Sequence, residues 1–159
     1  MNRNMTKRKK KYNFTNDTKV INGHTLYRIV ALRDFGLVDK GDLGGWIEKE
    51  ENLSHDGNCW VYDDAKVYDN AVIKNNARIC GDAEVCDNAK VYDNAEIYNY
   101  ARIYGNAEIR HGAMVCDNAA VCDNASVREN AKIYGKVVIR DHAIIRGRTE
   151  VDGDGIVCS

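Results

Sequence analysis

Residues 61–84 decide the fold, and they read VYDDAK, VYDNAV, IKNNAR and ICGDAE. The same six-residue period continues without insertion to residue 156, and each of the 16 hexads begins with Val or Ile. The fifth position is Ala in 13 of them, and the exceptions are Val137, Thr149 and Gly155. A helical period of 3.6 residues would spread this pattern over every face, and a plain strand would not require a small residue at each sixth place. The repeat therefore predicts short strands joined by tight corners.

A solenoid meets both requirements. The β-branched residue points inward, Ala occupies the narrow inner corner, and Asp, Asn or Gly at the third and fourth positions forms the turn, where a positive φ costs little. The [V/I]-x-x-x-A-x pattern resembles the hexapeptide-repeat proteins. That resemblance implies an all-β fold, a left-handed parallel β-helix with three faces. Three hexads per turn would make about 5 coils and a prism roughly 25 Å long.

The segment before the repeats differs in kind. Asn22-Gly23, flanked by strand-forming residues, is the signal of a two-residue hairpin, and a Gly-rich turn at 41–45 leads into a further strand. We expect residues 20–60 to form a hairpin and a cap over the first coil, because an open solenoid end exposes its core. Four apolar residues would close that end: Leu43, Trp46, Ile47 and Trp60. Residues 1–19 are predicted to be a disordered basic tail, and 61–159 to be the β-helix.

Three short segments carry a narrower resemblance: RDFG at 33–36, GDLGGWI at 41–47 and GNCWV at 57–61. They resemble the YdcK-like group of hexapeptide-repeat proteins. Proteins of this kind are carried by bacteria and prophages and are mostly classed as transferases from their fold. A fold alone is weak evidence for chemistry, so function has to be judged from the residues.

The charge is divided along the chain. Residues 1–11 carry six basic side chains and no acid, which leaves 17 of the 23 basic side chains against 24 acidic ones in residues 12–159. Such a tail is expected to be a solvated arm, or else to bind nucleic acid through Lys7–Lys11. No apolar stretch approaches the ~18 residues of a bilayer span, and none follows the basic N-terminus as in a secretory signal. We therefore expect a cytoplasmic protein without membrane contact, in a bacterium or, if phage-encoded, in its host.

The resemblance to transferases implies acyl transfer with a histidine as general base. Of the four histidines, His24 lies in the hairpin and His55 in the cap, whereas His111 and His142 occupy corner positions of the repeat. A solvated corner histidine with no acid placed to orient it is typical of a turn residue. The uninterrupted hexads also leave no loop to cover a substrate. We expect no catalytic residue and no cofactor, with His111 and His142 as the only candidates.

The cysteines indicate neither metal nor disulfide. The six cysteines lack the two-residue spacings of a zinc site. With three faces, Cys80 and Cys116 would lie two coils apart, roughly 10 Å, as would Cys86 and Cys122, which is too far for a disulfide. Free thiols fit a reducing compartment, and no metal site is expected.

Two surface features remain. Arg110, Arg128 and Arg146 would form one outward column, interpreted as stacked guanidinium groups neutralised by nearby acids or as an anion site. A second outward column passes from Lys66, Glu84 and Arg102 to apolar residues in the C-terminal coils. The corresponding column of a second face ends at Ile144, and Tyr134 also faces outward in these coils. We expect the apolar side chains around the last coil to form an interface in a dimer or trimer: Tyr134, Val138, Ile144 and Ile156.

Together these observations first indicate a non-enzymatic binding or scaffold protein, a self-associating β-helix that docks a macromolecular partner. The kinship with prophage-borne proteins extends this to an inhibitor of a host factor, including one of antiviral defence. One alternative is an acyl-CoA-dependent acyltransferase of the hexapeptide-repeat class. The other is nucleic-acid binding through the basic tail and the arginine column.

Overall fold

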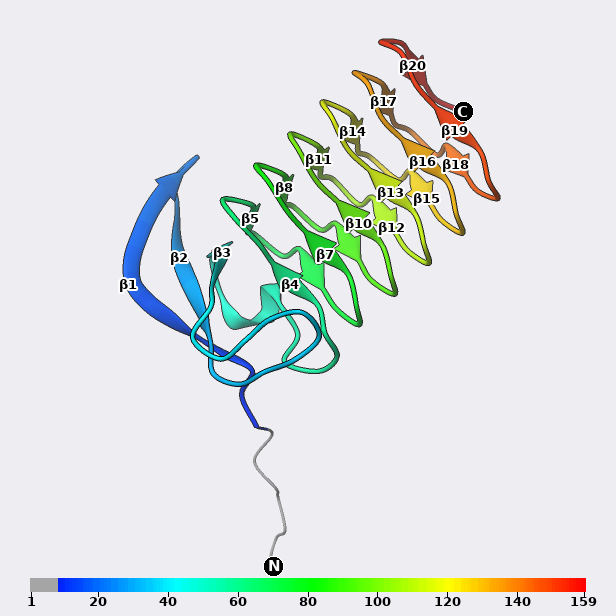
Figure 1. Ribbon diagram of the computed structural model, residues 1–159. Coiled ribbons are helices and arrows are strands. Elements are labelled where there is room, and N and C mark those ends of the chain that lie inside the picture. The colour runs from blue at the N-terminus through cyan, green and yellow to red at the C-terminus, as the bar shows by residue number, and fades with distance from the viewer. Residues whose placement is uncertain (1–8) are drawn as a thin grey trace, which may run out of the picture.

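A computed structural model describes residues 9–159, and it is nearly all β (Figure 1). Its single helical element is a 3-10 turn at Glu50–Asn52. Coils are stacked in one direction from a hairpin at the N-terminal end to the last strand at the far end. Within residues 9–159, no helix combines the length and apolarity needed to cross a bilayer. The predicted all-β parallel solenoid is confirmed, and its left hand stays a prediction from the resemblance.

From Trp60 onward the solenoid strands are two residues long, and each consists of a first-position residue of the repeat and the residue before it. They form three sheets in which parallel neighbours are one coil apart. One sheet contains β3 (Leu43–Ile47), β5 (Lys66–Val67), β8 (Glu84–Val85), β11 (Arg102–Ile103), β14 (Ala120–Val121), β17 (Val138–Ile139) and β20 (Ile156–Val157). A six-stranded sheet contains β4 (Trp60–Val61), β7 (Arg78–Ile79), β10 (Glu96–Ile97), β13 (Met114–Val115), β16 (Lys132–Ile133) and β19 (Glu150–Val151). A five-stranded sheet contains β6 (Val72–Ile73), β9 (Lys90–Val91), β12 (Glu108–Ile109), β15 (Ser126–Val127) and β18 (Ile144–Ile145).

The core follows the repeat. First-position Val and Ile and fifth-position Ala side chains line the interior and are buried through most of the coils, as at Ile97 and Ala101. Burial weakens at the far end, where Val151 is only half-buried and Thr149 and Gly155 are exposed. The three positions that depart from Ala are thus tolerated mainly where the packing is already looser.

At each corner of the solenoid, only one of the two turn positions has a positive φ. The third residue of every hexad has a positive φ, whereas the fourth does not. Asp serves there because its carboxylate also accepts a backbone N–H from the third residue one coil later, as between Asp63 and Gly81 (3.0 Å) and between Asp87 and Gly105 (2.9 Å). We call this series of third-position side chains the corner ladder. It satisfies a backbone donor that would otherwise lack a partner, which explains the preference for Asp over Gly.

The predicted hairpin is confirmed. β1 (Tyr12–Ile21) and β2 (His24–Ala31) are antiparallel, and Asn22 (φ 51°) and Gly23 (φ 83°) form the turn between them. β2 also pairs antiparallel with β3, so the hairpin extends that parallel sheet to nine strands. The boundary of the predicted tail is corrected, because residues 12–19 belong to β1 and are held by its pairing with β2. The disorder predicted for residues 1–8 lies outside the described residues.

The predicted cap is itself the first coil. Ile47 pairs with Val67, and Leu53 bridges to Ile73, so the inward positions begin fourteen residues before Val61. Eight residues rather than six separate Leu53 from Val61, which hides this coil from a search for hexads. Successive strands of the nine-stranded sheet from β3 to β20 therefore mark six turns instead of about five.

Three of the four predicted plugging residues are buried, but in two places. Ile47 lies in the main core, and Trp60 is 1% exposed against Phe35 and Tyr12. Trp46 packs outside the coil, beneath the hairpin, in a second cluster with Leu26, Tyr68 and Cys86. Leu43 is 56% exposed, so its predicted role is wrong, because its β-strand position faces away from the core.

Lys11 corrects the predicted solvated tail. Its side chain is fully buried, and its Nζ donates to the carbonyl oxygens of Cys59 (2.7 Å) and Gly57 (3.4 Å) above the ring of Phe35. Burial lowers the pKa of this amine, although the nearby Cys59 opposes the shift. Lys10 pairs with Glu50 at 2.9 Å. Of the residues proposed to bind nucleic acid, Lys11 is therefore occupied inside the protein, and Lys7 and Arg8 lie outside the described residues.

Candidate functional sites

A shallow groove crosses the six-stranded sheet at the N-terminal end of the solenoid. Leu37, Tyr62 and Arg78 line two adjoining depressions, one of about 210 Å³, and the outer one extends to Cys80 and Glu96. Asn76 and Asn94 line both the inner depression and a third, which ends at His111. Because neighbouring depressions share lining residues, they lie side by side in a row from Cys80 to His111, and we call this row the groove.

A loop overhangs this groove. Residues 32–42 leave the sheet after β2 and return to β3 through a tight turn, in which the backbones of Phe35 and Val38 bond to each other. Leu37 at the turn is 82% exposed and is the apolar wall of the groove. The expectation that no loop could cover a substrate is wrong. The loop comes from the region before the hexads, so the unbroken repeat could not reveal it.

His111 is a member of the corner ladder at the end of the groove. Its own N–H donates to Asp93 Oδ2 (3.2 Å), and its Nδ1 accepts the backbone N–H of Glu129 (3.2 Å). With Nδ1 occupied as an acceptor, the neutral imidazole carries its proton on Nε2. Nε2 lies 3.8 Å from Asp93 Oδ2, so an acid does lie beside this histidine, contrary to expectation. In this arrangement His111 can donate a hydrogen bond into the groove.

His142 is not brought near His111. It is an exposed fourth-position residue on a different corner, in the hexad that follows β17, and it does not line the groove. The two candidates therefore lie at different corners and cannot act together at one site, and His111 lines a depression that a ligand can occupy.

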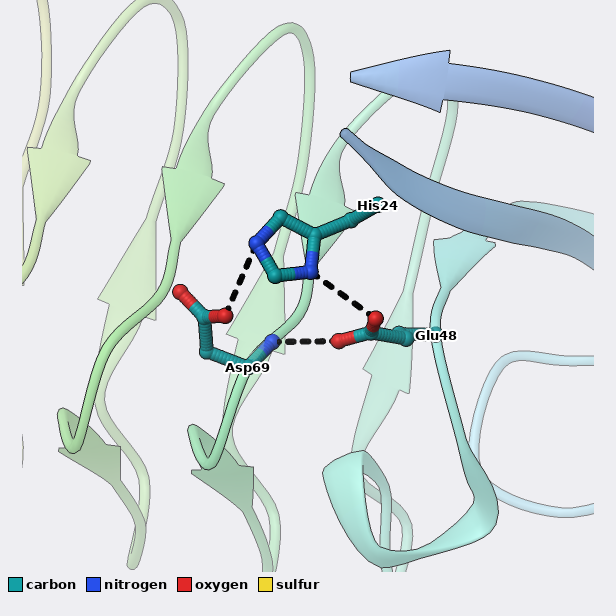
Figure 2. A group of neighbouring side chains, drawn as sticks. All are labelled: His24, Glu48 and Asp69. Carbon is teal, nitrogen blue, oxygen red and sulfur yellow. Dashed lines mark hydrogen bonds and ion pairs between the residues drawn. The ribbon is translucent and has the colours of Figure 1, made fainter. Parts of the chain in front are cut away.

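A charged cluster that was not predicted from the sequence lies beneath the hairpin (Figure 2). His24 at the start of β2 lies between two carboxylates, with Nδ1 2.9 Å from Glu48 Oε2 and Nε2 3.0 Å from Asp69 Oδ1. The other oxygen of Glu48 accepts the backbone N–H of Asp69 at 2.8 Å. Glu48 thus accepts a corner backbone N–H from the next coil, as the side chains of the corner ladder do in the later coils. Its other carboxylate oxygen is free to interact with His24.

The electrostatics of the cluster follow from this geometry. The hydrogen bond with Glu48 raises the pKa of His24, and Asp69 adds to that effect. Burial acts to raise the pKa of Glu48, but the hydrogen bonds from His24 and from the Asp69 N–H together hold it below its ordinary value. In the described geometry each imidazole nitrogen of His24 faces a carboxylate oxygen, so neither nitrogen is free to act as a base.

The arginine column is formed as predicted in position. Arg110, Arg128 and Arg146 follow β12, β15 and β18 at one residue per coil along the five-stranded sheet. Arg110 Nε lies 3.7 Å from Glu108 Oε1, and the interaction with Tyr92, together with the charge of Glu108, raises the pKa of its guanidinium. The contact with Glu108 fits the interpretation that nearby acids neutralise the stacked guanidinium groups. Anion binding by this column stays a prediction.

The four apolar interface candidates do not share one surface. Val138 and Ile156 pair in neighbouring strands of the nine-stranded sheet, beside Ala120. Ile144, which is 56% exposed, belongs to the five-stranded sheet, and Tyr134 follows a strand of the six-stranded sheet and donates to Glu150. Val138 and Ile156 therefore form one patch, and the other two residues lie on the remaining faces.

The comparisons with known proteins give a partial relative. The chain is 45% identical over 42 residues to the "Uncharacterized acetyltransferase YdcK" of Escherichia coli (strain K12). That match covers 26% of this chain and 13% of the relative, so the chain spans only a small part of its length. No family model matches the chain. The relative and the β-solenoid both fit a hexapeptide-repeat, transferase-like group.

Proposed function

We propose that the protein is an acyl-CoA-dependent acyltransferase of the hexapeptide-repeat class. The acetyltransferase name of the partial relative favours this alternative over the non-enzymatic scaffold that we expected first. Nothing in residues 9–159 or in the comparisons points to a host defence factor as a partner. The observation that carries the proposal is the row of adjoining depressions from the loop at Leu37 to His111.

The groove offers groups for both parts of an acyl thioester. Leu37 and Tyr62 supply apolar contact for the pantetheine arm, and the amides of Asn76 and Asn94 supply hydrogen bonds to its peptide-like groups. Arg78, half-exposed and paired with Glu96, is a cation for the phosphates. The cofactor would thus cross the six-stranded sheet with its thioester at the His111 end.

His111 would act there as a hydrogen-bond donor. Its Nε2–H would polarise the thioester carbonyl and stabilise the oxyanion that develops as the acceptor nucleophile attacks. The carbon–sulfur bond then breaks, and CoA leaves as the thiol after taking up the proton that the acceptor loses. In the tautomer set by Glu129, this role suits His111 better than that of a general base.

Binding of acetyl-CoA to the full chain tests the proposal. Saturating acetyl-CoA at about 100 times its dissociation constant should raise the free energy of unfolding by ~2.7 kcal/mol. Arg78→Ala should weaken binding, whereas Arg102→Ala should not, since Arg102 is paired with Glu84 on another sheet. His111→Asn should slow thioester consumption with an amine acceptor, and His142→Asn should not. An unchanged melting temperature at millimolar acetyl-CoA would overturn the proposal.

Self-association is a second candidate. The specific observation is the patch of Val138 and Ile156, which places two apolar side chains side by side on an outward face, with Ile156 59% exposed. A dimer or trimer that covers this patch is compatible with the enzymatic proposal. It would also serve a binding protein without catalytic activity.

A further inference from the structure

The cluster beneath the hairpin continues into the next coil. Asp69 is shared between two groups of potential ligands: one contains His24 and Glu48, and the other contains Cys86 and Asp87. Within each group the ligand atoms lie within 4.8 Å of one another. Asp69 therefore links two adjacent groups, which come from β2, the residue after β3 and two successive coils, and His24 and Glu48 lie on one side of it while Cys86 and Asp87 lie on the other.

The two carboxylates around His24 do different work. Glu48 is fixed by the Asp69 N–H at one oxygen and holds His24 Nδ1 with the other, so it sets the orientation of the imidazole ring. The ring then presents Nε2 to Asp69, on the side away from Glu48 (Figure 2). This order, carboxylate to imidazole to ligand partner, is the arrangement that orients metal-binding histidines in proteins.

The distances suit a cation between Nε2 and Asp69. For metal–ligand bonds of roughly 2.1 Å, two ligand atoms 3.0 Å apart subtend about 90° at the metal, which is an ordinary coordination angle. Asp69 Oδ2 accepts the Asp87 N–H at 3.3 Å, which leaves Oδ1 directed at His24. The Cys86 thiol lies on the wall of the site, 9% exposed and packed with Tyr68.

The charge balance also favours a cation. Glu48, Asp69 and Asp87 bring three negative charges to the neighbourhood of a single imidazole, and Asp87 contributes to the field at His24. Even with His24 protonated the group is two charges negative. A divalent cation would neutralise it while leaving His24 neutral, the form in which imidazole binds metals.

We propose that His24 Nε2 and Asp69 bind a divalent transition metal of the zinc type, with Glu48 as the positioning residue, and that Cys86 and Asp87, on the other side of Asp69, complete the coordination when the metal draws the two groups together. Imidazole, thiolate and carboxylate together are the donor set that Zn²⁺ and Co²⁺ accept, whereas Mg²⁺ and Ca²⁺ require oxygen donors. The metal joins the hairpin to the second and third coils. The prediction from cysteine spacing that there is no metal site is thereby replaced, because these ligands come from segments up to 63 residues apart in the sequence.

Calorimetric titration of chelator-treated full chain with ZnCl₂ tests the site. One equivalent should bind, and His24→Gln and Asp69→Asn should each abolish that binding. Glu48→Gln should weaken it roughly 10- to 100-fold, as expected for a positioning carboxylate. Asp93→Asn is the matched control, because Asp93 holds the same corner position one hexad after Asp87, on the next edge of the solenoid, and should leave binding unchanged.

Two further measurements separate a metal site from a simple ion triad. Asp87→Asn leaves both His24 contacts intact, so it should preserve the fold and still weaken binding. Co²⁺ should give a thiolate charge-transfer band that is lost in Cys86→Ser and retained in Cys80→Ser. Zinc affinity weaker than about 100 µM, or affinity unchanged in His24→Gln and Asp87→Asn, would overturn the proposal.

Discussion

Asp93 and His111 hold the same corner position in successive coils, and the carboxylate of Asp93 accepts the backbone N–H of His111 at 3.2 Å. His111 repeats this contact with Glu129 through Nδ1. A histidine that looks like an irregularity in the repeat thus performs the task of an Asp. Substitutions at His111 that keep or remove the acceptor for the Glu129 N–H can therefore distinguish its role in the corner ladder from its role at the groove.

Replacement of His111 by Val should destabilise the fold by about 1–3 kcal/mol, because a β-branched residue is strained at φ 56° and cannot accept the Glu129 N–H. His111→Asp retains the acceptor and should unfold near the wild-type urea midpoint. Equal midpoints for the Val and Asp variants would show that the corner ladder contributes nothing at this coil.

Ala101→Leu should lower the free energy of unfolding by about 3 kcal/mol, since Ala101 is fully buried at an inner corner between two coils. Ala120→Leu is the matched control: it adds the same side chain at a half-buried outward position in the nine-stranded sheet and should cost little. Urea unfolding of both variants measures the difference. If both are equally stable, the assignment of the inner corner is wrong.

The reactivity of Cys80 should rise steeply in alkali. Burial, aided by Asp63, raises the pKa of this thiol to about 11. The reactive thiolate is therefore only about 0.1% of the population at pH 8, and alkylation should accelerate roughly tenfold per pH unit up to that value. Mass spectrometry of peptides after iodoacetamide treatment follows this, with exposed Cys158 as the internal reference. Labelling of Cys80 as fast as Cys158 at pH 8 would contradict the burial.

Val138→Glu combined with Ile156→Glu should convert a self-associating protein into a folded monomer, because the paired side chains would repel across any interface that covers the patch. Light scattering measures the mass. Ser126→Glu, at the corresponding outward position of the five-stranded sheet, should leave the mass unchanged. A wild-type chain already monomeric at on the order of 50 µM would reject self-association through this patch.

The repeat made the solenoid predictable because one rule governs every hexad: Val or Ile inward, Ala at the corner, a residue tolerant of positive φ at the third position. The first coil escaped notice because two additional residues between Leu53 and Val61 break that rule. Lys11 was misjudged because its neighbours suggested a solvated run, whereas its partners are carbonyl groups of residues 57 and 59.

The charged cluster could not be predicted from spacing. Glu48 and Asp69 are ordinary acidic residues in the sequence, and each is selected only when β2 folds over the first two coils and brings His24 between them. His111 and Asp93 are 18 residues apart, one turn of the predicted three-hexad coil, so their proximity was available in principle from the period alone.

The ladder contacts and strand pairings within the repeats reach only 18 residues forward or backward. Beyond the coils that the hairpin contacts, each coil is consequently held by its two neighbours, so opening should proceed coil by coil rather than through the whole prism at once. Amide hydrogen exchange should then form a gradient, fastest in β19 and β20 and slowest around Ile79 and Ile97. The hairpin pairs antiparallel with itself and with β3 and does not follow the 18-residue spacing of the repeats. It would therefore slow the exchange of the coils next to it.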